Sequence, residues 1–153
     1  MAGRQGGARR EDGAAAFEIF ASDINQQVLA KARKGQYREN AFRATTPLLR
    51  EKYFTKEGDG SWKVRDEIRN RISFGRLNLY DEARVSLLGH LDVVFCRNVI
   101  IYFDDASKKV VVTNFYNRLI EGGYLLLGHS ESLISLSTQF KLRHLKNDMV
   151  YQK

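Results

Sequence analysis

Several features that mark particular protein classes are scarce in this chain of 153 residues. It has one cysteine, Cys96, which excludes an internal disulfide framework and a zinc site built from several cysteines, and which is typical of a reducing compartment. No uninterrupted apolar stretch approaches the roughly 20 residues that cross a bilayer. The first 16 residues lack the apolar centre of a secretory signal. We therefore predict a protein of the cytoplasm.

The positive charge of the chain is spread along its length. The formal net charge is +7, which suits an acidic partner such as a nucleic acid or an acidic protein surface. However, the basic residues form no dense run, and the sequence has neither a zinc-finger spacing nor the aromatic pattern of an RNA-recognition sheet. We therefore expect no nucleic-acid partner. A nucleic-acid binder, the alternative with the least support, would show an affinity that falls steeply with salt.

The first third of the chain predicts a leader followed by the start of an α/β repeat. Residues 1–16, rich in glycine, alanine and arginine, predict a flexible leader, and residues 17–153 a single domain. Residues 17–21 alternate in polarity as a strand does, and an acidic turn follows. The next residues predict a helix with Val28, Leu29 and Ala32 on one face, which Gly35 ends.

A small antiparallel unit is predicted in the middle of the chain, at about residues 53–74. Thr46 and Pro47 look like the cap and the first residue of a short helix that ends at Tyr53. Two β-prone runs then flank an Asp-Gly turn, which predicts a hairpin. Residues 72–74 alternate again and are expected to supply a third strand to this unit.

The C-terminal half predicts a sheet with buried parallel strands. Residues 91–96 form a continuous apolar run, which is typical of a strand buried on both faces. A helix over about residues 106–120 follows, and Gly122-Gly123 is expected to end it. The remaining elements are a further buried strand and the two arms of a terminal hairpin, at residues 124–128, 140–144 and 149–152.

Polar residues follow several of these predicted strands. In open α/β sheets the ligand lies beyond the carboxyl ends of the strands, so Asp23, Asn78 and the pair Arg97-Asn98 are candidate binding residues. A carboxylate such as that of Asp23 can accept hydrogen bonds from both hydroxyls of a ribose, or it can simply cap the next helix. Asn78 can hold an adenine edge or close a turn, and Arg97 and Asn98 can bind a ligand or form a structural salt bridge.

Two longer motifs carry a family resemblance. Asp92–Phe103 (DVVFCRNVIIYF) and Gly122–Leu133 (GGYLLLGHSESL) closely resemble the chemotaxis receptor glutamate methyltransferases, the CheR family. Ala21–Ile24, Leu77–Leu79 and the hairpin with Trp62 occur in the order found in that family. The resemblance covers residues 17–153.

The resemblance implies a fold, a cofactor and a site. The implied fold is α/β, a Rossmann-like class I methyltransferase sheet of seven strands with a terminal antiparallel hairpin and a small inserted antiparallel β-subdomain. The implied cofactor is S-adenosylmethionine, with no metal. By motif position, Asp23 would bind the ribose, Asn78 and Leu79 border the adenine, Arg97 and Asn98 line the cofactor pocket, and Tyr102 and Arg97 act at the reacting methyl group.

The implied reaction is methyl transfer to glutamate side chains of membrane chemoreceptors, with which a monomer would associate only peripherally. A glutamate is already ionised at neutral pH, so no general base is needed and alignment of the reacting groups can supply most of the catalysis. We accordingly interpret His129 and Glu131 as local loop structure, and Cys96 as a small buried residue that is not a nucleophile.

The family's first strand and Gly-rich loop have no counterpart before residue 17. Their absence would leave two open sheet edges, so we expect the cofactor to bind weakly or not at all and the activity to be impaired. An alternative function is a non-catalytic interaction module, in which the β-subdomain binds receptor tails or a signalling partner by strand addition. Trp62 is then either a peptide contact or a hydrophobic plug that fixes the hairpin.

Overall fold

The computed structural model of this chain describes residues 17–146 and 148–153, so the predicted leader at residues 1–16 lies outside the described part. The described residues fall into two compact units, which meet in the sequence at Arg76 and Leu77. Helices alternate with strands, and the sheets contain both parallel and antiparallel pairs, so the fold is α/β as predicted. Among these residues, no helix has the length and apolarity that crossing a membrane requires.

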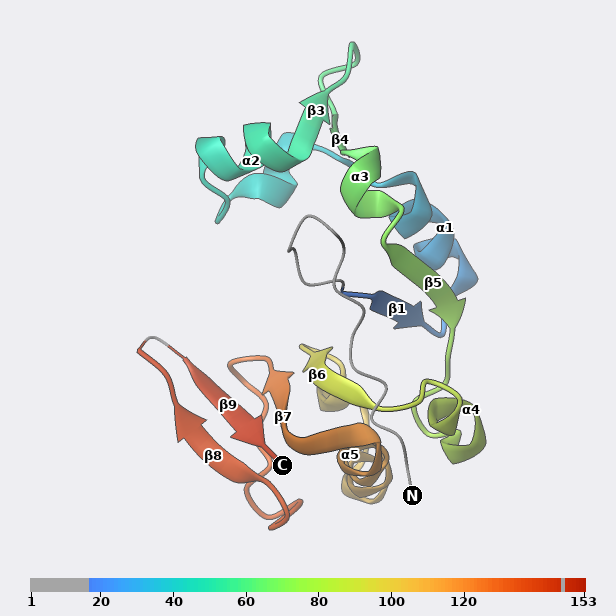
Figure 1. Ribbon diagram of the computed structural model, residues 1–153, viewed down its shortest axis with the longest axis vertical. Helices are drawn as coiled ribbons and strands as arrows, with labels where there is room; N and C mark the ends of the chain where they lie inside the picture. Colours follow the sequence, from blue (N-terminus) through green and yellow to red (C-terminus); the bar gives the residue numbers. More distant parts are fainter. Residues whose placement is uncertain (1–16, 147) are drawn as a thin grey trace, which may run out of the picture. The chain divides into compact units, whose positions relative to one another are not determined.

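The first unit contains a parallel strand pair with a helix packed against it (Figure 1). Strand β1 (Ile19–Asp23) pairs with β5 (Ile72–Arg76), and helix α1 (Gln26–Lys34) follows β1. The predicted helix and its stop are confirmed, because Gly35 adopts a φ of 63° that favours glycine. The predicted strand lies two residues too early, since pairing with β5 starts at Ile19 and continues to Asp23.

The first unit also contains a three-stranded antiparallel sheet in the order β2-β4-β3. Its strands and their flanking helices are β2 (Gln36–Tyr37), η1 (Glu39–Phe42), α2 (Pro47–Tyr53), β3 (Phe54–Lys56), β4 (Trp62–Val64) and α3 (Asp66–Arg69). The hairpin is confirmed, and so is the short helix, whose cap Thr46 accepts the N–H of Leu49. The predicted third strand is wrong: residues 72–74 lie in β5, and the third strand is β2, which has only two residues and hence no readable alternation.

Aromatic side chains hold this small sheet together. Trp62 is only 8% exposed; its ring lies 6.2 Å from that of Phe42, and its indole Nε1–H donates to Oε2 of Glu39 at 3.2 Å. The guanidinium carbon of Arg50 lies 4.4 Å from the centre of the indole ring, a cation–π contact, and Arg50 also forms an ion pair with Glu39. These contacts are those of a hydrophobic plug that fixes the hairpin, one of the two interpretations of Trp62.

The second unit is built on a four-stranded sheet in the order β6-β7-β9-β8 (Figure 1). Strands β6 and β7 are parallel, and the other two pairs are antiparallel. The terminal hairpin is therefore confirmed. The elements are α4 (Glu82–Ser86), β6 (Leu91–Cys96), η2 (Ile100–Tyr102), α5 (Asp105–Arg118), β7 (Leu119–Leu127), β8 (Lys141–His144) and β9 (Met149–Gln152).

Helix α5 ends earlier than predicted. The helix stops at Arg118, and Gly122-Gly123 lies inside β7 and does not end the helix. One reason is Lys153, whose Nζ donates to the main-chain carbonyls of Tyr116 (2.9 Å) and Leu119 (2.8 Å) and so binds carbonyl groups at the helix end. The glycine pair lies at a bulge, where the register between β6 and β7 shifts. The backbones come close there, since a Cβ on Gly123 would lie 3.0 Å from the carbonyl oxygen of Asp92 on β6.

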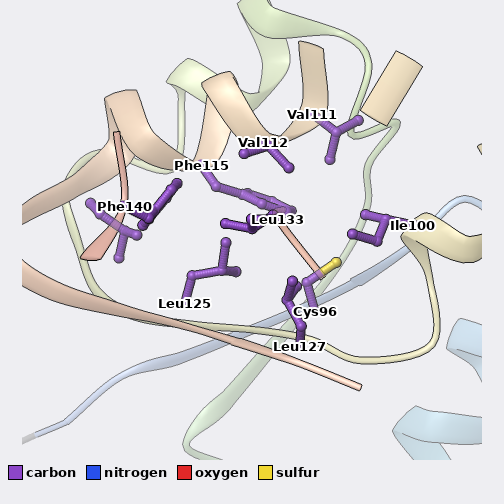
Figure 2. Close-up of a cluster of buried hydrophobic side chains, with 10 residues drawn as sticks. Cys96, Ile100, Val111, Val112, Phe115, Leu125, Leu127, Leu133 and Phe140 are labelled. Atoms are coloured by element: carbon purple, nitrogen blue, oxygen red, sulfur yellow. The ribbon is translucent and has the colours of Figure 1, made fainter. Parts of the chain in front are cut away.

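The core of the second unit lies between α5 and one face of the sheet. Figure 2 shows Val111, Val112 and Phe115 of α5 close to side chains of β7 and of the loop after it. The prediction that β6 is buried on both faces is wrong, because Phe95 is 74% exposed. Cys96, the next residue, faces the core and is buried, so among the described residues of the second unit one face of β6 is covered and the other is not.

Candidate functional site

The loops after β6 and β7 lie together at one edge of the sheet. Because these two strands are parallel, their carboxyl ends meet at the same edge, which is where α/β proteins bind ligands. The first loop includes Arg97, Asn98 and Tyr102, and the second begins at Gly128. Hydrogen bonds between the two loops fix their backbones against each other.

One carboxylate makes these hydrogen bonds. The side chain of Glu131 is 8% exposed and accepts four main-chain N–H groups, from Asn98 (2.7 Å), Val99 (2.9 Å), Ile101 (3.3 Å) and Gly128 (2.7 Å). Burial raises the pKa of Glu131, but the four donors together lower it by more, so the pKa lies below its usual value. The buried carboxylate is therefore ionised at neutral pH, and it fixes the first loop.

Two residues next to this carboxylate are held in tight or unusual conformations. Asn98 has a φ of 58°, the left-handed conformation that few residues other than glycine adopt. A Cβ on Gly128 would lie 2.4 Å from Oδ1 of Asn98 and 2.9 Å from Oε2 of Glu131, so only glycine fits without a shift. The two loops thus lie in close contact at Gly128 and Asn98.

The predicted residues of the first loop are accessible. Arg97 and Asn98 are exposed, and Tyr102 is 81% exposed. Among the residues that the structure describes, Arg97 forms no ion pair, so the salt-bridge alternative gains no support. The three side chains are brought to one loop, as the motif predicts.

Asn78 and Leu79 belong to the same unit as this loop. Oδ1 of Asn78 accepts the N–H of Tyr80 at 3.1 Å, which is the turn-closing role that the sequence left open. The carbonyl of Leu79 accepts a hydrogen bond from the side-chain amide of Asn114 on α5 at 3.0 Å, and the Leu79 side chain packs against the core. Asn114 is buried, so this segment is fixed to α5.

Asp23 lies in the first unit, at the last position of β1. Its Oδ1 accepts the N–H of Asn25 at 2.7 Å, and Asn25 in turn caps α1 by accepting from Gln27 and Val28. The helix cap is therefore Asn25 and not Asp23, so the capping alternative for Asp23 is wrong. The carboxylate of Asp23 is half-buried and accepts a single hydrogen bond from the described residues.

A groove of about 320 Å³ lies beside the first loop, within the second unit. Its lining includes Ile100 and Ile101, Lys108 and Lys109 of α5, and serines of the loop after β7. Lys108 pairs with Asp105 at 3.1 Å. The groove is thus lined by both apolar and charged or polar residues.

The thiol of Cys96 contributes no chemistry to this site. Cys96 is 4% exposed, and burial raises the pKa of its thiol to about 12, so it is a small core residue and not a nucleophile, as predicted. In residues 17–146 and 148–153, no cluster of three or more histidine, cysteine or acidic side chains is placed to hold a metal ion. His129 is exposed.

The role of Glu131 was only partly predictable. Its interpretation as loop structure is correct, but its three partners in the first loop lie at least 30 positions away in the sequence. The available signal is a glycine directly after a buried strand with an acid three residues later, as in Gly128 and Glu131. That spacing predicts a local turn and does not identify the distant loop as a partner.

Comparisons with known proteins agree with the motifs. The family model described as CheR methyltransferase, SAM binding domain, matches residues 7–149. Chemotaxis protein methyltransferase 2 of Vibrio cholerae is 40% identical over 137 residues, which cover 90% of this chain and 48% of that protein. Chemotaxis protein methyltransferase of Klebsiella aerogenes is 41% identical over 133 residues, covering 85% of this chain and 46% of that protein. The chain thus spans about half the length of these relatives.

A solved structure is also similar in part. The structure of an O-methyltransferase family protein from Burkholderia thailandensis matches with a TM-score of 0.43 and 15% identity, over 57% of this chain and 37% of that one. The family match begins at residue 7, within the segment predicted to be a leader, so the predicted boundary at residue 17 stays a prediction.

Proposed function

This chain belongs to the family of CheR methyltransferase SAM-binding domains, and on that premise we propose that it takes part in S-adenosylmethionine-dependent methylation of glutamate side chains of chemotaxis receptors. The observation that carries the proposal is the pairing of the two family motifs at the carboxyl ends of β6 and β7, where α/β proteins bind ligands. The finer fold class, a Rossmann-like class I methyltransferase domain, is part of the proposal.

Each of the candidate residues offers a group that suits this cofactor. The half-buried carboxylate of Asp23 accepts hydrogen bonds, as the ribose hydroxyls require, and we assign it to them. We assign Asn78 and Leu79 to the adenine, because an exposed amide beside a packed leucine offers both hydrogen bonds and an apolar contact. Arg97 and Asn98, both exposed after β6, are assigned to the remainder of the cofactor.

The reaction requires the chain to position the glutamate carboxylate and the methyl group. S-adenosylmethionine, when bound, supplies a methyl group on a positively charged sulfur, and a receptor glutamate is already ionised at neutral pH. The chain therefore has no proton to remove and has to align the carboxylate oxygen with the methyl carbon. Tyr102 and Arg97 are the residues proposed for this task, since both side chains extend from the rigidly held first loop.

Methyl transfer to receptor-containing membranes tests this proposal directly. We expect the label of methyl-radiolabelled S-adenosylmethionine to enter the receptor and to be released as methanol by base, which distinguishes an ester from a methylamine. Arg97→Ala should reduce the rate at least tenfold, because it removes a charge at the site. Arg43→Ala, which changes an exposed arginine of the first unit, is the matched control and should leave the rate unchanged.

Two outcomes would count against the proposal. Binding of receptor segments without any transfer would favour the non-catalytic interaction module. An equal loss of transfer in Arg97→Ala and Arg43→Ala would show that the rate reports overall charge and not a site.

A further inference from the structure

We propose that Glu131 is a positioning residue that holds the backbone of the first loop, Arg97–Tyr102, in the conformation needed for cofactor binding. The proposal concerns the geometry of the loop, and its link to the cofactor rests on the proposed function above. Glu131 does not touch the cofactor or the substrate in this proposal. It acts through the main chain of its neighbours.

The two oxygens of the Glu131 carboxylate accept hydrogen bonds from different donors. Oε2 accepts the N–H groups of Asn98 and Gly128, each at 2.7 Å. Oε1 accepts the N–H groups of Val99 at 2.9 Å and Ile101 at 3.3 Å. Each oxygen therefore accepts from two donors, and neither position can be taken by a group that itself donates.

A neutral side chain of the same shape cannot replace the carboxylate of Glu131. A glutamine at this position replaces one oxygen with an amide nitrogen that carries two hydrogens and cannot accept. Whichever way the amide turns, its NH2 group meets two N–H donors, either those of Asn98 and Gly128 or those of Val99 and Ile101. Two backbone donors then lose their acceptor in a buried place.

The backbone of residues 98–101 depends on Glu131 for most of its hydrogen-bond acceptors. The carboxylate accepts three of the four N–H groups between Asn98 and Ile101. Asn98 holds a left-handed φ of 58°, a conformation that persists only when its surroundings enforce it. The crowding at Gly128 shows that this enforcement is tight. Loss of the carboxylate is therefore expected to release the segment that carries Arg97, Asn98 and Tyr102.

The test uses nuclear magnetic resonance on the labelled 153-residue chain. In the unaltered chain, the amide shifts of Asn98, Val99, Ile101 and Gly128 should titrate together with one pKa below the usual glutamate value. This measurement needs no variant. In Glu131→Gln the shared titration should vanish, and the four amides should exchange with solvent at least tenfold faster. Core amides such as that of Leu125 should keep their protection.

Cofactor binding is measured on the same samples by following amide shifts during titration with S-adenosylmethionine. We expect Glu131→Gln to weaken binding roughly tenfold while the core stays folded, because positioning is lost. Glu82→Gln removes an exposed carboxylate of the same unit and is the matched control. It should change neither the exchange rates nor the affinity.

The outcomes separate the two proposals. Failure of the four amides to share a titration, or their unchanged exchange in Glu131→Gln, would overturn the positioning role. Equal affinity of the variant and the unaltered chain would overturn the link to cofactor binding. Absence of any binding by the unaltered chain would count against the proposed function, while the titration and exchange results would still decide whether Glu131 fixes the loop.

Discussion

Two carboxylates near the carboxyl ends of parallel strands behave in opposite ways. Asp23 ends β1, is half-buried and accepts one hydrogen bond from the described residues, from the nearby N–H of Asn25. Glu131 follows β7, is buried and accepts four N–H groups, three of them from a distant loop. A carboxylate of the first kind retains the capacity to bind ligand hydroxyls, whereas one of the second kind has its acceptor sites filled by the protein.

The difference shows why position after a strand is not enough to identify a ligand. Both residues satisfy the rule that binding groups follow parallel strands. What separates them is the number of protein donors that each carboxylate already accepts. Substitutions at or beside the crowded carboxylate, and at the accessible one, therefore test this difference.

The largest effect is expected from Gly128→Ala. The added Cβ would lie 2.4 Å from Oδ1 of Asn98 and 2.9 Å from Oε2 of Glu131, so these groups must shift and their hydrogen bonds lengthen. We expect a loss of about 1–3 kcal/mol in the free energy of unfolding of the chain, measured by urea denaturation with circular dichroism. Gly58→Ala, with no atom within 4 Å of the added Cβ, is the control and should change it by less than about 0.5 kcal/mol. Equal losses would show that the crowding at Gly128 is relieved at no cost.

The next effect is on binding, through Asp23→Asn. Asparagine keeps an oxygen for the N–H of Asn25 but loses the charge and one acceptor, so stability should hold while S-adenosylmethionine binds roughly tenfold more weakly. Titration followed by amide shifts measures the affinity. Glu51→Gln removes an exposed charge from the same unit and should leave the affinity unchanged. An unaltered affinity in Asp23→Asn would remove Asp23 from the site.

A smaller effect is expected at Asn98, where the backbone conformation and the side chain can be separated. Asn98→Gly keeps the left-handed φ of 58° without strain, whereas Asn98→Ala does not. The alanine variant should therefore be about 1 kcal/mol less stable than the glycine variant, as measured by urea denaturation. Equal stability would mean that the loop relaxes to an ordinary φ when the asparagine is removed.

The smallest effect is expected from mild acid. The pKa of Glu131 is lowered in the folded state, since its hydrogen bonds outweigh burial, so its stabilising contribution is complete above the ordinary value of 4.5. The contribution is lost only as the pH falls from there through the folded-state pKa. The stability difference between the unaltered chain and Glu131→Gln should thus be constant from pH 7 to 5 and narrow below 4.5. A difference that widens in acid would mean that the pKa is raised.

Local sequence signals predicted most of the elements. Gly35, the Thr46-Pro47 pair and the Asp-Gly turn before Trp62 each have a local conformational preference, and the elements they mark are confirmed. Errors arose where distant groups decide the outcome. Lys153 binds carbonyl groups at the end of α5, more than thirty residues away in the sequence. Strand β5 pairs with β1, although the strands of the antiparallel sheet lie between them in the sequence.

In the candidate site, too, local residues were predicted and contacts between distant residues were not. The motif around Arg97 and Asn98 identified the first loop, because residue types alone carry that information. The acceptor that holds the loop in place, Glu131, could not be assigned, since four converging N–H groups are a property of the folded backbone. Likewise, the sequence offered Asp23 as a ribose ligand or as the helix cap, and only the geometry assigns the cap to Asn25.

The plug in the small antiparallel sheet has an experimental use. Trp62 is the chain's one tryptophan, and it lies buried in the first unit beneath the guanidinium of Arg50. Selective excitation of its indole therefore gives a fluorescence signal that follows melting of the first unit alone, whereas circular dichroism follows both units. Two unfolding curves recorded on one sample would reveal directly whether the two units unfold in a single cooperative transition.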